Sequence, residues 1–160
     1  MPATTTFRIP ARRRHVPTAR QYARKVLADW GVSDELADTV ALSTSELVTN
    51  AVLHCRISYA QVEIALTLDG ADLVLEVSDP DRDRLPRPHD SAPHEEGGRG
   101  LALVAALSDT WGCRQEPYRK CVWARFTVAE ARGHHGRGRG PSPVRVPDPA
   151  RSGPVGQDPR

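Results

Sequence analysis

The first thirty residues show a short strand-like stretch followed by apolar positions at helical spacing. Residues 4–10 are rich in β-branched side chains and stop at Pro10, which predicts a short strand. Pro17 then opens a stretch with a helical pattern, and Gly31 stands where a helix commonly ends. We therefore expect a helix over residues 18–30.

Ser33 begins a second and longer helical pattern. Its hydroxyl can cap a helix N-terminus, and the acidic side chains of Asp34 and Glu35 suit the first turn. Apolar residues recur at helical spacing as far as about His54. This helix is the longest element that the pattern predicts.

A change to strict alternation follows the long helix. Residues 60–79 contain two alternating runs on either side of Asp69 and Gly70, a pair that is typical of a tight β-hairpin. Residues 80–98 are polar, proline-rich and without a pattern. Because so long a loop is uncommon inside a domain, we expect it to be a functional lid or to be disordered.

The closing elements complete a mixed α and β pattern. A helix opened by glycines ends near Ser108, and residues 111–117 and 120–128 read as two strands. We predict an α+β fold, a two-layer α/β sandwich with helices on one face of a mostly antiparallel mixed sheet.

The overall composition narrows the class of protein. Apolar residues make up 39% and charged residues 26% of the 160 residues, and no apolar run is long enough to cross a membrane. The three arginines at 12–14 have no apolar stretch behind them, so they do not mark a secretory signal. Three cysteines without close pairing argue against a disulfide framework and favour a reducing, cytoplasmic location.

The basic charge is concentrated in the last thirty residues. Residues 131–160 contain six Gly, six Pro, six Arg and two Asp, and we expect them to be a disordered tail. Residues 1–130 contain 16 Lys and Arg against 18 Asp and Glu, so the predicted domain is not a basic nucleic-acid binder by charge. The chain therefore divides into a domain, 1–130, and a tail, 131–160.

Glu46, Asn50 and His54 form a polar line along the second predicted helix, each four residues from the next. The line could face water, but Leu42 and Leu53 flank it, and we interpret it as half-buried. A buried amide and carboxylate need partners, which a bound ion or ligand would supply. An Asn carbonyl oxygen suits Mg²⁺, and a Glu can orient or deprotonate a hydroxyl.

Two further segments have candidate binding chemistry. Asp79 ends a predicted strand before Pro80, where it could accept hydrogen bonds from an exocyclic amine or simply begin a turn. The sequence GGRGL at 97–101 opens a helix, where glycines let a phosphate approach the backbone and the helix N-terminus favours anions. The alternative for this segment is a flexible hinge.

In this order and spacing, the motifs SELVTNAVLH, VSDP, GGRGL and KCVWARF resemble those of the GHKL ATP-binding superfamily, which has the Bergerat fold. The resemblance covers roughly residues 5–130. Within the superfamily, the chain more narrowly resembles the anti-sigma-factor serine/threonine kinases of actinobacteria. It implies that Asn50 holds the Mg²⁺ of a bound ATP, that Glu46 is the base that activates a serine hydroxyl, and that Asp79 binds the adenine amino group.

The resemblance also assigns the remaining nucleotide contacts. The phosphates would lie against the glycine segment, which comprises Gly98, Arg99, Gly100 and Leu101. Residues 80–98 would be the ATP lid. Cys121 stands where the family commonly has a Thr that helps hold adenine, and a thiol is the weaker hydrogen-bonding group. The sequence DPDRD at 79–83 lacks the two glycines that often follow the adenine-binding Asp, so we expect a modest affinity for nucleotide.

These motifs favour an ATP-dependent protein kinase that regulates transcription. Its expected substrate is an anti-sigma-factor antagonist of the STAS type, its client is a sigma factor, and a second copy of the chain is a further candidate partner. The alternative is a module that switches partners without phosphorylation, with or without bound ATP; the altered DPDRD segment favours it.

Other functions fit the residues less well. Phosphohistidine chemistry would need an acceptor on a long helix, whereas His15 lies in a short segment before Pro17. The Arg/Gly tail could bind single-stranded nucleic acid, but it has no aromatic residue for stacking. The cysteines lack zinc-ligand spacing, and a plain α+β domain without a ligand would leave the three ordered motifs unexplained.

Overall fold

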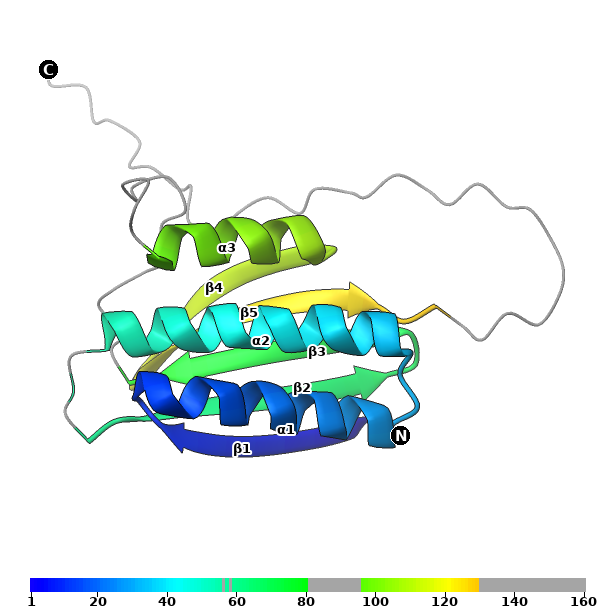
Figure 1. Ribbon diagram of the computed structural model, residues 1–160, viewed down its shortest axis with the longest axis horizontal. Helices are drawn as coiled ribbons and strands as arrows, with labels where there is room; N and C mark the ends of the chain where they lie inside the picture. The colour runs from blue at the N-terminus through cyan, green and yellow to red at the C-terminus, as the bar shows by residue number, and fades with distance from the viewer. Residues whose placement is uncertain (56, 58, 81–95, 130–160) are drawn as a thin grey trace, which may run out of the picture.

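A five-stranded sheet with helices along one face organises the chain (Figure 1). The computed structural model describes residues 1–55, 57, 59–80 and 96–129, with side chains in the last range from residue 100 onward. The elements in chain order are β1 (Ala3–Pro10), the short 3-10 helix η1 (Arg13–His15), α1 (Val16–Asp29), α2 (Asp34–His54), β2 (Gln61–Asp69), β3 (Asp72–Asp79), α3 (Glu96–Leu107), β4 (Thr110–Glu116) and β5 (Arg119–Thr127). The predicted α+β two-layer sandwich is confirmed.

Local sequence signals set the ends of these elements. The Ser33 hydroxyl accepts a hydrogen bond from the backbone N–H of Leu36 at 3.3 Å, so it caps α2 as predicted. Gly31, just after α1, and Gly70, in the β2–β3 turn, have φ angles of 75° and 59°. These left-handed conformations are readily available only to glycine, which explains the chain reversals at both positions.

The strand order is β1-β2-β3-β5-β4, so β5 lies between two strands that precede it in the chain. Every pairing is antiparallel. The predicted mostly antiparallel sheet is confirmed. The parallel pairing that a mixed sheet would contain does not occur among the strands that the structure describes. The return of β5 into the sheet beside β3 brings the final predicted strand against the strand that ends at Asp79.

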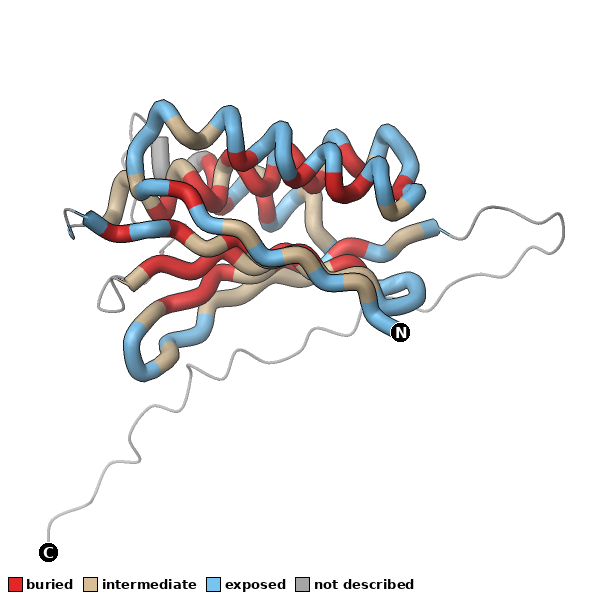
Figure 2. Tube along the Cα trace, turned by 90° about the horizontal axis from the view of Figure 1, so that it is seen from below, coloured by how far each residue is buried: buried red, intermediate tan, exposed pale blue. Residues whose placement is uncertain are grey.

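The core lies between the sheet and the three helices within the described residues. Figure 2 shows the buried positions on the helices turned toward the sheet. α2 is the central helix and packs against α1, α3 and β3. On the sheet, Leu73, Leu75 and Val77 of β3 alternate with outward positions and belong to the buried cluster, as do their partners on β5. This alternation assigns each strand residue to an inner, helix-facing side or to an outer side.

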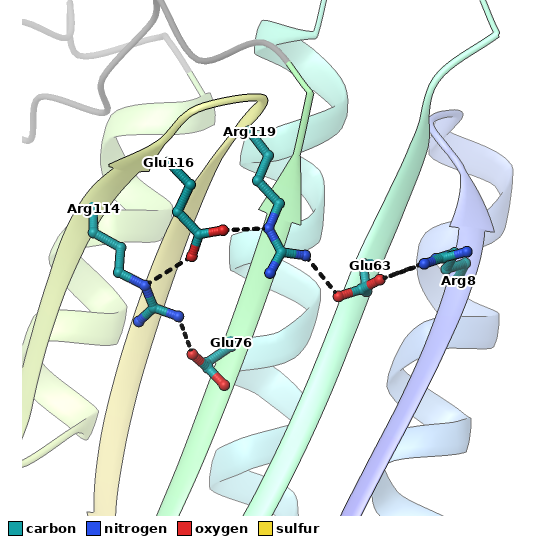
Figure 3. Close-up of polar contacts among 6 residues, drawn as sticks. All are labelled: Arg8, Glu63, Glu76, Arg114, Glu116 and Arg119. Carbon is teal, nitrogen blue, oxygen red and sulfur yellow. Dashed lines mark hydrogen bonds and ion pairs between the residues drawn. The ribbon is translucent and has the colours of Figure 1, made fainter.

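The outer face of the sheet has a ladder of alternating charges, which we call the outer-face ladder (Figure 3). Glu63 of β2 accepts hydrogen bonds from Arg8 of β1 at 3.0 Å and from Arg119 of β5 at 2.9 Å. Glu116 bridges Arg119 and Arg114, and Arg114 also pairs with Glu76 of β3. The ladder crosses the sheet from β1 to β4 and balances three Arg with three Glu.

Two sequence predictions fall outside the structural description. The tail at 131–160 and most of the segment at 80–98 are not among the described residues. Within the described ranges, no helix is long and apolar enough to cross a membrane.

Candidate nucleotide-binding site

Most side-chain hydroxyls of α2 are satisfied within the helix. Thr39, Ser43 and Thr44 each donate to the backbone carbonyl four residues earlier, at 2.8–3.0 Å. The polar line is partly buried as expected, with Asn50 buried and Glu46 partly exposed, but Leu42 is 40% exposed and contributes little to this burial. α3 packs against α2 and places Gly100 beside Glu46.

Asn50 is the unsatisfied member of the polar line. Its side chain is only 5% exposed, and its Oδ1 has no hydrogen-bond partner among the described residues. A buried carbonyl oxygen without a partner costs about 1–3 kcal/mol. The atom is a hard oxygen donor of the kind that Mg²⁺ takes, so the chemistry of Asn50 fits the predicted metal ligand.

Glu46, one turn before Asn50, lies against the glycine segment. A Cβ placed on Gly100 of α3 would come within 2.8 Å of Glu46 Oε2 and 3.4 Å of its Cβ. Gly100 is buried, whereas Glu46 is partly exposed. The structure therefore brings together the carboxylate of SELVTNAVLH and a glycine of GGRGL, two motifs that are far apart in the sequence.

The rest of the glycine segment divides into two parts. Gly98 and Arg99 belong to the first turns of α3, where backbone N–H groups point out of a helix, and the Arg99 side chain is outside the description. Leu101 is 2% exposed and its side chain belongs to the hydrophobic core. A nucleotide contact from Leu101 would therefore have to come from its backbone.

Asp79, the predicted adenine ligand, is paired across the sheet with Lys120. Both residues are 3% exposed, and Lys120 Nζ lies 3.9 Å from Asp79 Oδ2. They share the inner face with Val77 and Val122, two rungs back along the same strands. Lys120 is a site residue that the sequence analysis missed, because only the register between β3 and β5 places it beside Asp79.

Cys121, predicted to contact the nucleotide, faces the other way. It alternates with Lys120 along β5 and pairs with Ser78 of β3 and Arg114 of β4, on the outer side of the sheet. Burial raises the pKa of its thiol, although a hydrogen bond with Ser78 opposes this. The assignment of Cys121 to the adenine site is therefore corrected: its thiol lies under the outer-face ladder.

Cys113 of β4 is the cysteine on the inner face. It pairs with Val122 and packs against the core. Burial raises the pKa of Cys113 to about 11, and the charges of Lys120 and Asp79 act on the thiol in opposite directions. Cys113 is therefore a neutral thiol beside the Asp79–Lys120 pair at physiological pH.

These groups gather at one end of the molecule. In Figure 1 the C-terminal end of α2, the end of β3, the start of α3 and the start of β5 all lie at the left-hand side. The arrangement offers an oxygen donor from Asn50, a carboxylate from Glu46, helix N–H groups from α3 and a charged pair from the sheet. No cluster of three or more His, Cys, Asp or Glu side chains occurs in the described part of the chain, so a protein-only metal cage is not what these residues form.

Comparison with known proteins identifies a matching family and a similar fold. The family described as "Histidine kinase-like ATPase domain" matches residues 9–126. A solved structure of the RsbU and RsbW domains of Rv1364c from Mycobacterium tuberculosis is similar in fold, with a TM-score of 0.62 at 20% identity. The match covers 81% of this chain and 34% of that one, so this chain spans about a third of the other's length. No curated protein matches the sequence.

Proposed function

The chain belongs to the histidine kinase-like ATPase family, and from this premise we propose that it binds Mg-ATP and transfers the γ-phosphoryl group to a serine or threonine of a partner protein. The family match confirms the resemblance to the GHKL superfamily that the motifs indicated. The finer parts of the proposal, which are the metal, the acceptor and the partner, rest on the geometry of individual residues.

The observation that carries the proposal is the buried Oδ1 of Asn50, which has no partner among the described residues. A protein that only needed a stable helix would place an apolar residue at this 5% exposed position. Asn50 would hold Mg²⁺ by this oxygen, and the ion would neutralise charge on the triphosphate. Because Mg²⁺ usually keeps several waters and substrate oxygens, one protein oxygen is a sufficient contribution.

Glu46 is the group we assign to the transfer step. Its carboxylate would accept the proton of the acceptor hydroxyl as that oxygen attacks the γ-phosphorus, and ADP would leave with the bond to the γ-phosphoryl group broken. The contact with Gly100 supports this role because it holds the carboxylate beside the start of α3. The N–H groups of that first turn would bind phosphate oxygens.

The partner follows from the motif resemblance. We propose a STAS-type anti-sigma-factor antagonist as the phosphoacceptor and a sigma factor as the client that is released or sequestered. A second copy of the chain is a further partner in this proposal, and the cytoplasm is the compartment where all three would meet.

A second function, partner switching without phosphorylation, is favoured by a different observation. Asp79 already has an ion-pair partner in Lys120, and both are buried. If that pair were purely structural, the carboxylate would be committed and adenine would lose its main contact. The chain would then sequester its partner in an ATP-independent manner.

Two variants separate these functions. Calorimetry with ATP and Mg²⁺ should show Mg²⁺-dependent binding that Asn50→Ala loses, whereas Glu46→Gln should bind ATP within a few-fold of the unmodified protein. With a STAS-type antagonist and labelled ATP, Glu46→Gln should reduce phosphoserine or phosphothreonine formation by about 10²–10⁴-fold.

The outcomes that contradict the proposal are distinct. ATP binding without any phosphorylated antagonist, combined with sequestration that Glu46→Gln leaves intact, would establish the partner-switching function. An absence of ATP binding at millimolar concentration would remove the nucleotide from the function altogether.

A further inference from the structure

The buried Asp79–Lys120 pair is the feature that the proposed phosphoryl transfer leaves unexplained. Lysine is rarely buried to 3% exposure, and burying two charges costs several kcal/mol per ion before their attraction is counted. An apolar pair would serve a β-sheet at least as well. A buried ion pair is therefore weak support for stability and calls for another reason.

The two groups form an ordered pair of an acceptor and a donor. The register places Asp79 and Lys120 directly opposite each other on neighbouring strands, with Nζ 3.9 Å from Oδ2. A carboxylate can accept about four hydrogen bonds and an ammonium can donate three, so the contact between them does not by itself use the full hydrogen-bonding capacity of either group. Their common position on the inner face directs both toward the helices rather than toward the outer-face ladder.

The edge of adenine presents the complementary pattern, a 6-amino donor next to the N1 acceptor. We propose that Lys120 is a base-recognition residue that donates a hydrogen bond to adenine N1 while Asp79 accepts from the 6-amino group. This inference rests on the proposed ATP site and deepens it by naming a second reader of the base.

The arrangement also explains how the site would discriminate between purines. The triphosphate end of the nucleotide is fixed by Asn50 and the first turn of α3, so the base cannot turn over freely in the site. Guanine has a carbonyl oxygen at position 6 and an N–H at position 1, the reverse order of acceptor and donor. That order would set the carbonyl oxygen against Asp79 and the N–H against Lys120, and both contacts are unfavourable.

The test compares nucleotides that differ by single atoms, in the full chain, with calorimetry as the readout. The probes are ATP, 1-deaza-ATP, which lacks the N1 acceptor, and purine riboside triphosphate, which lacks the 6-amino group. We expect each analogue to bind the unmodified protein about tenfold more weakly than ATP, since a hydrogen bond to a charged group is lost in each case. GTP should bind more weakly still.

Variants then assign the N1 contact to Lys120. In Lys120→Met, ATP and 1-deaza-ATP should bind with equal affinity, whereas the preference for ATP over purine riboside triphosphate should remain. Lys120→Arg should retain a preference for ATP over 1-deaza-ATP. Because Lys120→Met leaves a buried carboxylate without its cation, Asp79→Asn/Lys120→Met serves as a second, uncharged background in which the same equality is expected.

Each result decides between the two proposals. Equal binding of ATP and 1-deaza-ATP by the unmodified protein would overturn the role of Lys120 and leave the ATP site standing. A preference for ATP over 1-deaza-ATP that persists in both Met variants would assign N1 to another residue and overturn it as well. If none of the nucleotides binds, the proposed function fails, and the inference fails with it.

Discussion

Gly100 of α3 lies against the carboxylate of Glu46 on α2, so closely that a methyl group at Gly100 would come within 2.8 Å of Oε2. Glycine within a helix is less stable than alanine by roughly 0.5–1 kcal/mol. The glycine therefore carries a cost in helix stability, and what it preserves is the space that the Glu46 side chain occupies. This contact joins the residue we assign to proton transfer with the segment we assign to phosphate binding.

Gly100→Ala should separate stability from function. The helix gains propensity while the Glu46 carboxylate is pushed aside, and that carboxylate is the movable end of its side chain. We expect the free energy of unfolding to change by less than about 1 kcal/mol. Phosphoryl transfer, measured with labelled ATP and the antagonist, should fall at least about tenfold because small displacements at a reacting centre are costly.

The control for this substitution is the double variant Glu46→Ala/Gly100→Ala. It removes the crowded carboxylate, so its unfolding midpoint in urea should exceed that of Gly100→Ala, yet its transfer activity should stay low. If Gly100→Ala alone retained full activity, the contact would be only a matter of packing.

Asn50→Leu should make the protein more stable and less able to bind. The substitution removes a buried oxygen that has no partner within the described structure, so the free energy of unfolding without ligand should rise by about 1–3 kcal/mol. Mg²⁺-dependent ATP binding should be lost. Urea unfolding and calorimetry on the same preparation measure both effects.

Ser45→Ala provides the matched control. Ser45 Oγ is also buried and without a partner among the residues described, but it lies about 140° around α2 from Asn50. Its removal should stabilise the protein while ATP binding stays unchanged. If Ser45→Ala also lost ATP binding, the loss of binding in Asn50→Leu would have to be attributed to a change in α2 as a whole and not to the Asn50 oxygen.

The sequence predicted the local elements well because their signals are local. Ser33 and Gly31 marked the ends of α2 and α1 through backbone requirements that neighbouring residues create. The turn between β2 and β3 was likewise recognisable from Asp69 and Gly70. The motif order predicted the family, which the match over residues 9–126 confirms.

The face of the sheet on which each strand residue lies could not be predicted from local signals in the same way. Cys121 and Lys120 are adjacent, and only the pairing of β5 with β3 decides which one faces Asp79. A shift by one residue exchanges the two faces, and no local signal fixes that register. The contact between Glu46 and Gly100 is also non-local, since it depends on how α3 packs on α2.

Glu63→Gln tests the outer-face ladder. Burial would raise the pKa of Glu63, but hydrogen bonds from Arg8 and Arg119 outweigh it and hold the pKa below its ordinary value of 4.5. The ionised form is therefore favoured by folding, so its stabilisation is present above about pH 4.5 and is lost as the pH falls below that. At neutral pH the substitution should lower the free energy of unfolding by on the order of 1 kcal/mol.

The pH and salt dependence provide the check on this effect. The difference between Glu63→Gln and the unmodified protein should shrink as the pH falls through the acidic range, and it should also shrink in high salt. A double-mutant cycle with Arg8→Gln isolates one pair. A difference that stays constant from neutral to acidic pH would show that the charges of the ladder contribute nothing.

Cys113 should make the protein less stable in alkaline solution. Burial raises its pKa from 9.0 to about 11, so the unfolded chain loses this proton first. Between about pH 9 and 11 the folded state binds more protons than the unfolded state, and stability therefore falls as the pH rises. Cys113→Ser should remove this part of the slope in urea unfolding. Cys55→Ser, at the partly buried thiol that follows α2, serves as the comparison.

The position of β5 has a consequence for how the protein is made. β5, which lies between β3 and β4 in the sheet, is the last described element to leave the ribosome, so both strands lack this neighbour until late in synthesis. Until residue 127 has emerged, both strands keep an unpaired edge and Asp79 has no Lys120 beside it. The Asp79–Lys120 pair of the site therefore forms only in the step that closes the sheet, late in synthesis.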